Sequence, residues 1–354
     1  DRIQIKTKKP DPLLLNKLVV VFISPKSHKN FEEPVGTGPY MLSSNDKNKL
    51  VLKRFDDYYG SKPFFKEIEL LTIPDKERRL AALRSGSVQM LADVPPDFIG
   101  QLKNDFIIKS VPSLEVNFLI FNVEDSVLKN KELRRALKNA IDRDGFMKFA
   151  GGFARPVGQF VSSGVFGFNP QIKNVVLSLA DAKKNLSQIN DPPLENAKLT
   201  LDFPEGLEVI GQYLQSQMQD IGLALELNPL TQSALQEKIS NGTSQFYYLG
   251  WRSELGDASD FLQAIAHSKD KTGLYGNFNG AHYANPNVDE LIETSQYDLN
   301  TKNRLKKLQD AMRIIVEDDS IGIPLFEADT LFAFNKNINF EPRVDGYIHA
   351  YEIN

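Results

Sequence analysis

Residues 116–149 read VNFLIFNVEDSVLKNKELRRALKNAIDRDGFMKF. The first six of these residues are apolar apart from Asn117, a pattern typical of a buried strand. From residue 132 to residue 149 apolar side chains recur at helical spacing, which predicts a helix. The residues at that spacing are Leu133, Ala136, Leu137, Ala140 and Ile141. A buried strand followed directly by a helix is a building unit of α/β folds, so this stretch predicts an α/β chain.

The segments on the carboxyl side of this stretch continue the alternation. Strand patterns are found at residues 198–203, 224–227, 245–251 and 326–334. Helix patterns are found at residues 179–189, 208–220, 233–239, 288–297 and 302–316, and Asn300 or Thr301 is expected to cap the last of them. A turn is predicted at Asp191-Pro192-Pro193. Strands that alternate with helices over this length favour the α/β class.

The segments on the amino side are mostly short strands joined by turns. Residues 2–7 alternate between polar and apolar, which predicts a half-buried strand, and residues 13–22 are apolar enough to be buried. Further strand patterns lie at residues 50–55, 68–73, 88–91. Asp75 is a predicted N-cap for a helix that ends at Gly86, and residues 97–102 predict another brief helix.

Length and composition exclude several classes of protein. A chain of 354 residues exceeds what one hydrophobic core usually organises, so two globular units are expected. Lys plus Arg number 42 against 46 for Asp plus Glu, and this balance argues against nucleic acid as a partner. No cysteine is present, which excludes disulfides and thiol catalysis. No run approaches the about 20 apolar residues that a membrane-spanning helix needs.

No catalytic or metal-binding constellation is predicted. The four histidines have no metal-ligand spacing, and neither a Gly-x-Ser-x-Gly elbow nor a phosphate-binding loop occurs. Gly36 and Gly38 precede Pro39-Tyr40 rather than a helix, so they do not form a nucleotide fingerprint. The acidic residues at 56–57 and 317–319 are expected to be solvated. The sequence therefore predicts no enzyme, no metal site and no cofactor.

Several short motifs follow one another in a distinctive order. They are PVGTGPY at 34–40, LKRFDDYY at 52–59, LRSGSVQ at 83–89, FN at 121–122, LRRAL at 133–137, AIDR at 140–143, GW at 250–251, NP at 285–286 and IPL at 323–325. Together they resemble the peptide/nickel (oligopeptide/dipeptide) family of extracytoplasmic solute-binding proteins that serve ABC importers. Gln89 departs from the pattern, since the family carries Asp there.

The resemblance implies a two-lobed, periplasmic-binding-protein-like α/β fold of type II, in the peptide-binding cluster. It assigns residues 1–115 to a remnant of lobe I, residues 116–327 to lobe II and residues 328–354 to the return into lobe I. The family's chains begin with a further portion, so the chain is expected to be N-terminally truncated and its first lobe incomplete. Crossing strands near residues 114–122 and 326–330 would act as hinges while each lobe moves rigidly.

The resemblance also implies a set of ligand-binding residues. Behind the Trp of its aromatic strand the family offers an Asp to the amino terminus of a peptide, and Glu254 occupies that place here. The predicted ligand-binding residues are Trp251, Glu254, Asp257, Asn117, Asn122, Tyr248 and Arg252. Structural alternatives stay open: Trp251 as a core residue, Glu254 as a solvated loop carboxylate, and Asp257 as a residue that shapes its turn.

The expected function is capture of a peptide or other small solute for delivery to the membrane subunits of an ABC importer. The protein is expected to act as a monomer at the periplasmic or extracellular face of the membrane, with its signal or lipid anchor outside this chain. Leu207-Glu208-Val209 stands where dipeptide receptors of the family carry an Arg, which disfavours a dipeptide receptor of that kind. The alternative is a ligand-sensing domain of a transcriptional regulator; a hydrolase is disfavoured.

Overall fold

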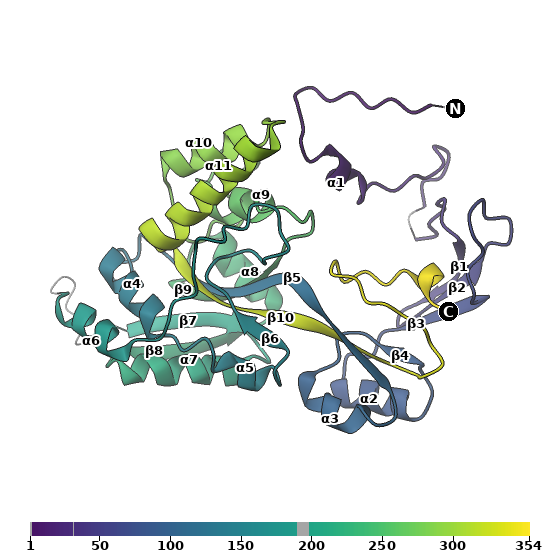
Figure 1. The fold of residues 1–354 in the computed structure, drawn as a ribbon, viewed down its shortest axis with the longest axis horizontal. Coiled ribbons are helices and arrows are strands. Elements are labelled where there is room, and N and C mark those ends of the chain that lie inside the picture. Colours follow the sequence, from purple (N-terminus) through teal and green to yellow (C-terminus); the bar gives the residue numbers. More distant parts are fainter. Residues whose placement is uncertain (1, 31, 190–197) are drawn as a thin grey trace. The chain divides into compact units, whose positions relative to one another are not determined.

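The computed structural model of the chain describes residues 2–30, 32–189 and 198–354 (Figure 1). The chain divides into a larger unit, which holds the residues up to Asn16 together with Leu114–Ala328, and a smaller unit of Lys17–Ser113 and Asp329–Asn354. It passes between the units after Asn16 and again within strands β5 (Ile107–Phe121) and β10 (Gly322–Phe334). These units are defined by internal packing alone, so the lobe boundaries derived from the family resemblance stay a prediction.

The larger unit is built on a mixed sheet. Its strand order is β10-β5-β9-β7-β8, and β6 pairs with β10. The strands not yet bounded are β6 (Ala154–Pro156), β7 (Lys198–Pro204), β8 (Ala224–Leu230) and β9 (Phe246–Arg252). Strand β7 runs parallel to both β8 and β9, whereas β5 and β9 are antiparallel.

Helices cover both faces of this sheet (Figure 1). One layer contains α4 (Lys131–Ala140), α5 (Phe146–Phe149), α6 (Leu179–Ser187) and α7 (Glu208–Asp220). The other contains α8 (Gln232–Ser240), α9 (Ser259–Phe261), α10 (Pro286–Ser295) and α11 (Thr301–Arg313), with the π-helical segments η3 (Leu262–Ala266) and η4 (Ile314–Asp318). This arrangement is the α/β fold that the sequence predicted.

Strand β5 explains the apolar run that opens at Val116. Side chains alternate along a strand, so Val116, Phe118 and Ile120 enter the core beneath α8–α11. Leu119 and Phe121 enter the opposite core, beneath α4–α7. Both faces are buried, and a strand of this kind has a continuous rather than an alternating apolar sequence. The predicted strand is confirmed, although it begins nine residues earlier, at Ile107.

The helix predicted over residues 132–149 is wrong as a single element. Helix α4 ends at Ala140, Ile141 is extended, and α5 begins only at Phe146. The break has local causes. The N–H of Asp142 donates to Gln217 Oε1 at 2.7 Å, and the buried Arg143 Nε donates to Pro324 O at 2.8 Å. These contacts hold residues 141–144 outside a helix, and side-chain periodicity does not reveal this break.

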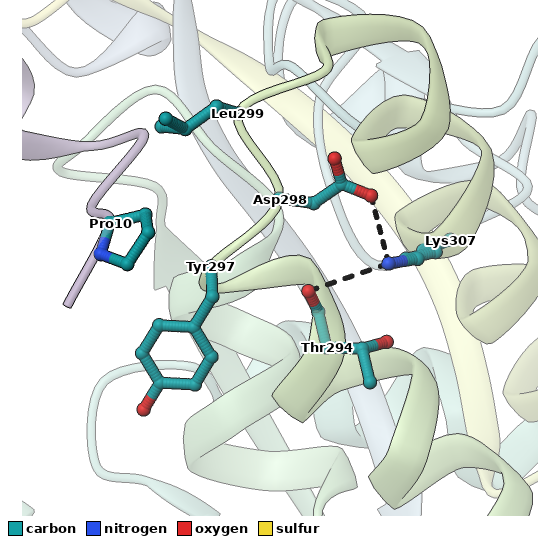
Figure 2. A pocket seen from close by; sticks show the side chains of 6 residues that line it. All are labelled: Pro10, Thr294, Tyr297, Asp298, Leu299 and Lys307. Carbon is teal, nitrogen blue, oxygen red and sulfur yellow. Dashed lines mark hydrogen bonds and ion pairs between the residues drawn. The ribbon is translucent and has the colours of Figure 1, made fainter.

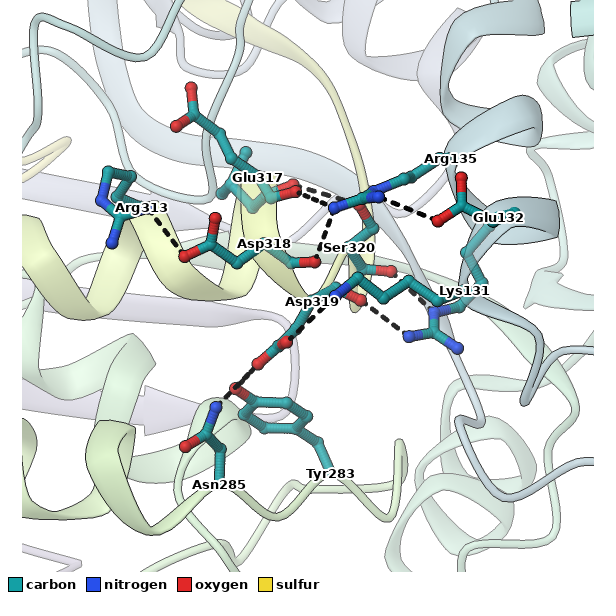
Figure 3. Close-up of polar contacts among 12 residues, drawn as sticks. Lys131, Glu132, Arg135, Tyr283, Asn285, Arg313, Glu317, Asp318, Asp319 and Ser320 are labelled. Carbon is teal, nitrogen blue, oxygen red and sulfur yellow. Dashed lines mark hydrogen bonds and ion pairs between the residues drawn. The ribbon is translucent and has the colours of Figure 1, made fainter. Parts of the chain in front are cut away.

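Helix α4 carries cations on the face that packs against the end of η4. Arg134 Nη2 donates to Asp319 O at 2.7 Å, and Lys138 Nζ donates to Val316 O at 2.8 Å. Arg135 donates to the carbonyl of Asp318 (Figure 3). The last carbonyls of a helix lack intrahelical partners and carry partial negative charge, so cations suit this position. Burial lowers the pKa of Lys138 to about 8.

Asp319 completes the same cluster with its side chain. Its carboxylate accepts hydrogen bonds from Tyr283 Oη at 2.6 Å and from Asn285 Nδ2 at 2.8 Å (Figure 3). Lys131 Nζ lies 3.9 Å from the other oxygen. Residues 317–319 were expected to be solvated, but the side chain of Asp319 instead binds neighbouring segments of the fold.

Gly322 lies where β10 crosses β5 at close range. A Cβ at this position would lie 2.2 Å from Leu119 O and 3.2 Å from Ile120 Cα, and both are backbone atoms of a central strand. Gly322→Ala is therefore expected to lower the free energy of unfolding by about 1–3 kcal/mol. Urea unfolding followed by fluorescence measures the loss. Gly100→Ala is the control, since nothing lies within 4 Å of its Cβ position; equal stabilities of the two variants would contradict the argument.

The smaller unit contains an antiparallel sheet and a small core. The sheet has the order β1-β2-β3, formed by Tyr40–Asp46, Lys49–Arg54 and Glu67–Leu71. Asp75 caps α2 (Lys76–Arg84) as predicted, because its carboxylate accepts from the N–H of Arg78 at 2.8 Å. The remaining elements are β4 (Met90–Leu91), which pairs with the end of β10, η1 (Pro96–Phe98), α3 (Ile99–Leu102) and η5 (Ala350–Glu352). The core joins Val111, Phe332, Phe334 and Phe340.

Two predictions near the start of the chain are wrong. Residues 2–7 form no strand and are exposed, because no described strand pairs with them and alternation alone does not make a strand. Within residues 13–22, Leu13 is buried, but Phe22 is 89% exposed and α1 (Leu14–Leu18) buries no side chain. The turn predicted at residues 191–193 lies outside the described residues.

Candidate ligand-binding site

The register of β5 against β9 decides which predicted site residues share a face. Asn117 pairs with Gly250, and Glu115 pairs with Arg252. Directly paired residues point to the same face of a sheet, so Asn117, Tyr248 and Arg252 are brought together. Trp251 pairs with Val116 and points to the opposite face. The aromatic strand therefore divides its predicted ligand residues between two surfaces.

The first of these faces ends in polar groups around an exposed glycine. Buried Tyr248 donates its hydroxyl to Asn117 Oδ1 at 2.8 Å, and burial together with the nearby Glu115 raises the pKa of Tyr248. Arg252 Nε lies 3.8 Å from Glu115 Oε2. A Cβ on Gly250 would lie 2.9 Å from the Glu115 carboxylate and 3.1 Å from Asn117 Oδ1. Because Gly250 has no side chain, its backbone stays accessible between the Asn117 amide and the Glu115–Arg252 ion pair.

Trp251 packs on the other face as an aromatic wall. Its ring meets Phe261 and Phe278 edge to face, with centroids 6.2 Å and 5.9 Å apart. It is only partly buried and is packed against the core beneath α8–α11. These contacts agree with the core interpretation of Trp251; ligand contact stays a prediction.

The loop that follows β9 is anchored at both ends. The N–H of Ser253 donates to Leu114 O at 3.1 Å, and Gly256 O accepts from the N–H of Phe166 at 2.9 Å. Between these anchors the side chain of Glu254 is exposed. The segment therefore presents one carboxylate to solvent from a fixed backbone, an arrangement suited to binding a cation.

Asp257 lies at the end of this loop, and its side chain is buried. It is 2% exposed, and its two oxygens accept from Arg304 Nη1 at 2.6 Å and Arg304 Nη2 at 2.8 Å. The Arg304 guanidinium also lies over the Phe166 ring, 5.1 Å from its centroid. Both carboxylate oxygens are thus engaged, as the turn-shaping alternative expects; the ligand role predicted for Asp257 stays a prediction.

Asn122 lies at the far end of β5 from Glu115. Asn122 follows Glu115 by seven positions along the chain, a distance of about 23 Å at about 3.3 Å per residue. Asn122 Oδ1 accepts from the N–H of Glu124 at 3.0 Å, and its Nδ2 lies 3.5 Å from Gly242 O. The structure therefore does not bring Asn122 together with Asn117.

Two residues at this site were absent from the sequence prediction. Glu115 and Gly250 belong to the site because the pairing of β5 with β9 brings them next to the other site residues. A single sequence does not reveal which strands pair, or in which register. The available signal was a charged residue, Glu115, placed immediately before the apolar run.

A hollow of the larger unit lies beside the link between α10 and α11 (Figure 2). It is lined by Pro10, Thr294, Tyr297, Asp298, Leu299 and Lys307. Lys307 Nζ donates to Asp298 Oδ2 at 2.8 Å and lies 3.5 Å from Thr294 O. The two charged residues of the lining, Lys307 and Asp298, therefore pair with each other.

The described part of the chain contains neither a membrane-spanning helix nor a cluster of metal ligands. None of the helices in that part of the chain combines the length and apolar character that crossing a membrane requires. Residues 2–30, 32–189 and 198–354 also contain no group of three or more potential metal ligands among His, Asp and Glu.

Comparison with known proteins identifies the family. A family profile described as bacterial extracellular solute-binding proteins, family 5 Middle, matches residues 1–273. The chain belongs to this family. The resemblance to peptide/nickel solute-binding proteins is thereby confirmed, and solute-binding proteins of this kind are not enzymes.

Curated relatives of the family 5 chain include binding proteins that are named for different ligands. The probable D,D-dipeptide-binding periplasmic protein DdpA of Escherichia coli is 26% identical over 321 residues, which cover 89% of this chain and 61% of that protein. The nickel-binding protein NikA of Staphylococcus aureus is 25% identical over 98% of this chain and 71% of that protein. The chain thus spans less than two thirds of the length of DdpA.

Solved structures of family 5 type share the fold. The substrate-binding protein CtaP of Listeria monocytogenes has a TM-score of 0.86 at 21% identity, covering 98% of this chain and 74% of that one. DppA of Helicobacter pylori in complex with the peptide STSA has a TM-score of 0.79 at 22% identity, covering 94% of this chain and 68% of that one. Such neighbours are type II periplasmic binding proteins of the peptide/nickel cluster, so the predicted fold class is confirmed.

Proposed function

We propose that this family 5 chain captures a peptide-like solute outside the cytoplasm and delivers it, as a monomer, to the membrane subunits of an ABC importer. The observation that carries the proposal is the exposed Glu254 carboxylate on an anchored loop, beside the polar end of β5 and β9. Relatives whose names describe peptide-binding proteins support it, and so does a family of extracellular solute-binding proteins. These relatives also favour transport over the sensing domain of a regulator.

The chemistry of the proposed site suits the two ends and the backbone of a peptide. Glu254 would pair with an ammonium group, since charge-assisted hydrogen bonds are roughly twice as strong as neutral ones. Arg252 would meet a carboxylate, and the open backbone at Gly250 with the Asn117 amide would hydrogen-bond to main-chain groups. Tyr248 would hold Asn117 in place through its hydroxyl. Capture without reaction needs no more than these groups.

The proposed mode of capture is closure of two lobes around the solute. We assign residues 1–115 and 328–354 to lobe I and residues 116–327 to lobe II, as the family resemblance implies. The long strands β5 and β10 would then be the hinges, because they carry the chain from one unit to the other. Trapping a solute between rigid lobes requires no bond to be made or broken.

Glu254→Gln tests the proposal directly. Defined pools of di-, tri- and tetrapeptides are screened by thermal shift, and a positive peptide is measured by calorimetry. Removing the charge is expected to weaken binding by about tenfold, which is about 1.4 kcal/mol. Acetylating the peptide's amino group should weaken wild-type binding equally and have little further effect on the variant.

Glu226→Gln is the matched control, because Glu226 is also exposed but lies on β8. A separate arm uses a nickel–histidine complex, since nickel-binding proteins are among the relatives. Silence of every peptide pool with wild-type protein would contradict peptide capture. Unchanged peptide affinity in Glu254→Gln would contradict the assigned role of Glu254.

A further inference from the structure

The exposed Glu254 carboxylate is carried by a tight turn. The N–H of Gly256 donates to Ser253 O at 3.0 Å, so Glu254 and Leu255 are the two central residues of a four-residue turn. Gly256 has a φ of 63°, in the left-handed region that glycine adopts without strain. Residues 253–256, the Glu254 turn, thus set the direction of the Glu254 side chain.

A residue from the start of the chain binds the middle of the Glu254 turn. Asn16 Nδ2 donates to Leu255 O at 2.8 Å, although 239 positions separate the two residues along the chain. Leu255 directly follows Glu254, so this hydrogen bond acts one residue away from the exposed carboxylate. The side chain of Asn16 therefore restricts the part of the turn on which the direction of the carboxylate depends.

That amide belongs to an anchored stretch of chain, residues 9–16, here called the amino-terminal segment. Lys9 Nζ lies 4.5 Å from the centroid of the Tyr297 ring, a cation–π contact. Pro10 lines the hollow beside the link between α10 and α11 (Figure 2). Leu13 is buried, which stabilises the attachment further. The amino-terminal segment is therefore held on the larger unit, to which it belongs.

Helix α1 carries Asn16, and the start of this helix is fixed by Asp11. The Asp11 carboxylate accepts from the N–H of Leu13 at 3.0 Å, and the Asp11 carbonyl accepts from the N–H of Leu14 at 3.2 Å. Such bonds satisfy amide groups that have no partner at the beginning of a helix. The donor to the Glu254 turn thus lies on a short helix with a defined start, and the chain enters the smaller unit at the next residue, Lys17.

We propose that Asn16 is a positioning residue for solute capture: its amide holds the Glu254 turn in the conformation whose carboxylate pairs with the ammonium group of a peptide. This inference rests on the proposed function and deepens it, because it concerns the same carboxylate. A turn that is held before the solute arrives loses less conformational entropy on binding. The effect of Asn16 on affinity passes through Glu254, so a peptide that does not use Glu254 does not sense it.

Asn16→Ala tests this role with the peptide found in the Glu254→Gln experiment. Calorimetry should show an affinity about three- to fivefold below that of wild type, because one hydrogen bond to the turn is lost. In the Glu254→Gln background the same substitution should change affinity by less than about 1.5-fold, since the two residues act on one contact. The peptide with an acetylated amino group should bind Asn16→Ala and wild-type protein about equally.

Further variants isolate the amide group. Asn16→Gln keeps the amide on a longer side chain and should recover part of the affinity. Asn16→Asp places an acceptor against the Leu255 carbonyl and should lose at least as much as Asn16→Ala. Asn303→Ala is the matched control, because Asn303 is an exposed asparagine on α11 of the same unit. Asn16 is exposed as well, so its variants should unfold at the wild-type temperature.

Hydrogen exchange of the Glu254 turn is a measurement that needs no ligand. The N–H of Gly256 closes the turn, so its exchange rate reports how often the turn opens. Mass spectrometry of a fragment that covers residues 253–256 should show exchange about threefold faster in Asn16→Ala than in wild type. Asn303→Ala should match wild type.

The outcomes distinguish this inference from the proposed function. Equal exchange of the turn in Asn16→Ala and wild type would overturn the positioning role, even if peptides bind. Equal losses of affinity with and without the Glu254 carboxylate would mean that Asn16 contacts the solute itself, which also contradicts the inference. Silence of all peptide pools, together with faster exchange in Asn16→Ala, would instead overturn the proposed function, and with it the effect of Asn16 on capture.

Discussion

Arg304→Met should lower the free energy of unfolding of the larger unit by about 3–5 kcal/mol. Arg304 and Asp257 are 4% and 2% exposed, and two short hydrogen bonds join them. Removing the guanidinium leaves the Asp257 carboxylate buried, with neither water nor a cation to stabilise its charge. This unpaired buried charge accounts for most of the lost stability. Urea unfolding followed by the emission of Trp251, which lies in the same unit, measures the change.

Two further variants isolate the cause. Arg313→Met removes an exposed cation from the end of the same helix, where its partner is Asp318 at 2.7 Å, and should cost under about 1 kcal/mol. Arg304→Met combined with Asp257→Asn should regain part of the loss, because no buried charge is left unpaired. A loss in Arg304→Met no larger than that in Arg313→Met would contradict the argument.

Arg134→Met should have an effect of similar size, about 3–5 kcal/mol. Arg134 is 6% exposed, and its guanidinium donates to four carbonyls: Leu128 O, Lys129 O, Ser320 O and Asp319 O, at 2.7–3.0 Å. Burial lowers the pKa of Arg134, so this desolvated charge relies on those carbonyls. Methionine fills the volume but leaves the carbonyls without donors. Unfolding in urea at constant pH is again the measurement.

The neighbouring Arg135 provides the matched control. Its side chain is 38% exposed, its partner Glu132 is solvated, and its contacts to the carbonyls of Glu317 and Asp318 are 3.4 Å and 3.1 Å long. Arg135→Met should therefore cost about 1 kcal/mol or less. If the two variants lost the same stability, burial of Arg134 would not be the reason for its importance.

Sequence patterns predicted the elements whose periodicity dominates their structure. The strand at Val116, the helices at residues 208–220 and 302–316, and the Asp75 cap were found because side-chain spacing and capping chemistry act locally. The break after Ala140 was missed, because its causes are Gln217 and Pro324, about 75 and 180 residues away along the chain.

The candidate site was predictable only in part, for a related reason. The family resemblance directed attention to Glu254, and the structure leaves its side chain exposed as a binding role requires. The separation of Trp251 from Tyr248 depends on strand register, and the engagement of Asp257 depends on Arg304 of helix α11. Long-range pairing of this kind is not encoded in spacing.

The place of β10 beside β5 has a consequence for synthesis. Two hundred residues separate the end of β5 from the start of β10, so the ribosome must complete nearly the whole larger unit before β5 receives this neighbour. Until then a strand whose last six residues are apolar apart from Asn117 has one open edge, a known hazard for aggregation. The carbonyls that the cations of α4 bind are made equally late. Nascent chains halted before Gly322 should therefore depend on chaperones, whereas completed ones should not.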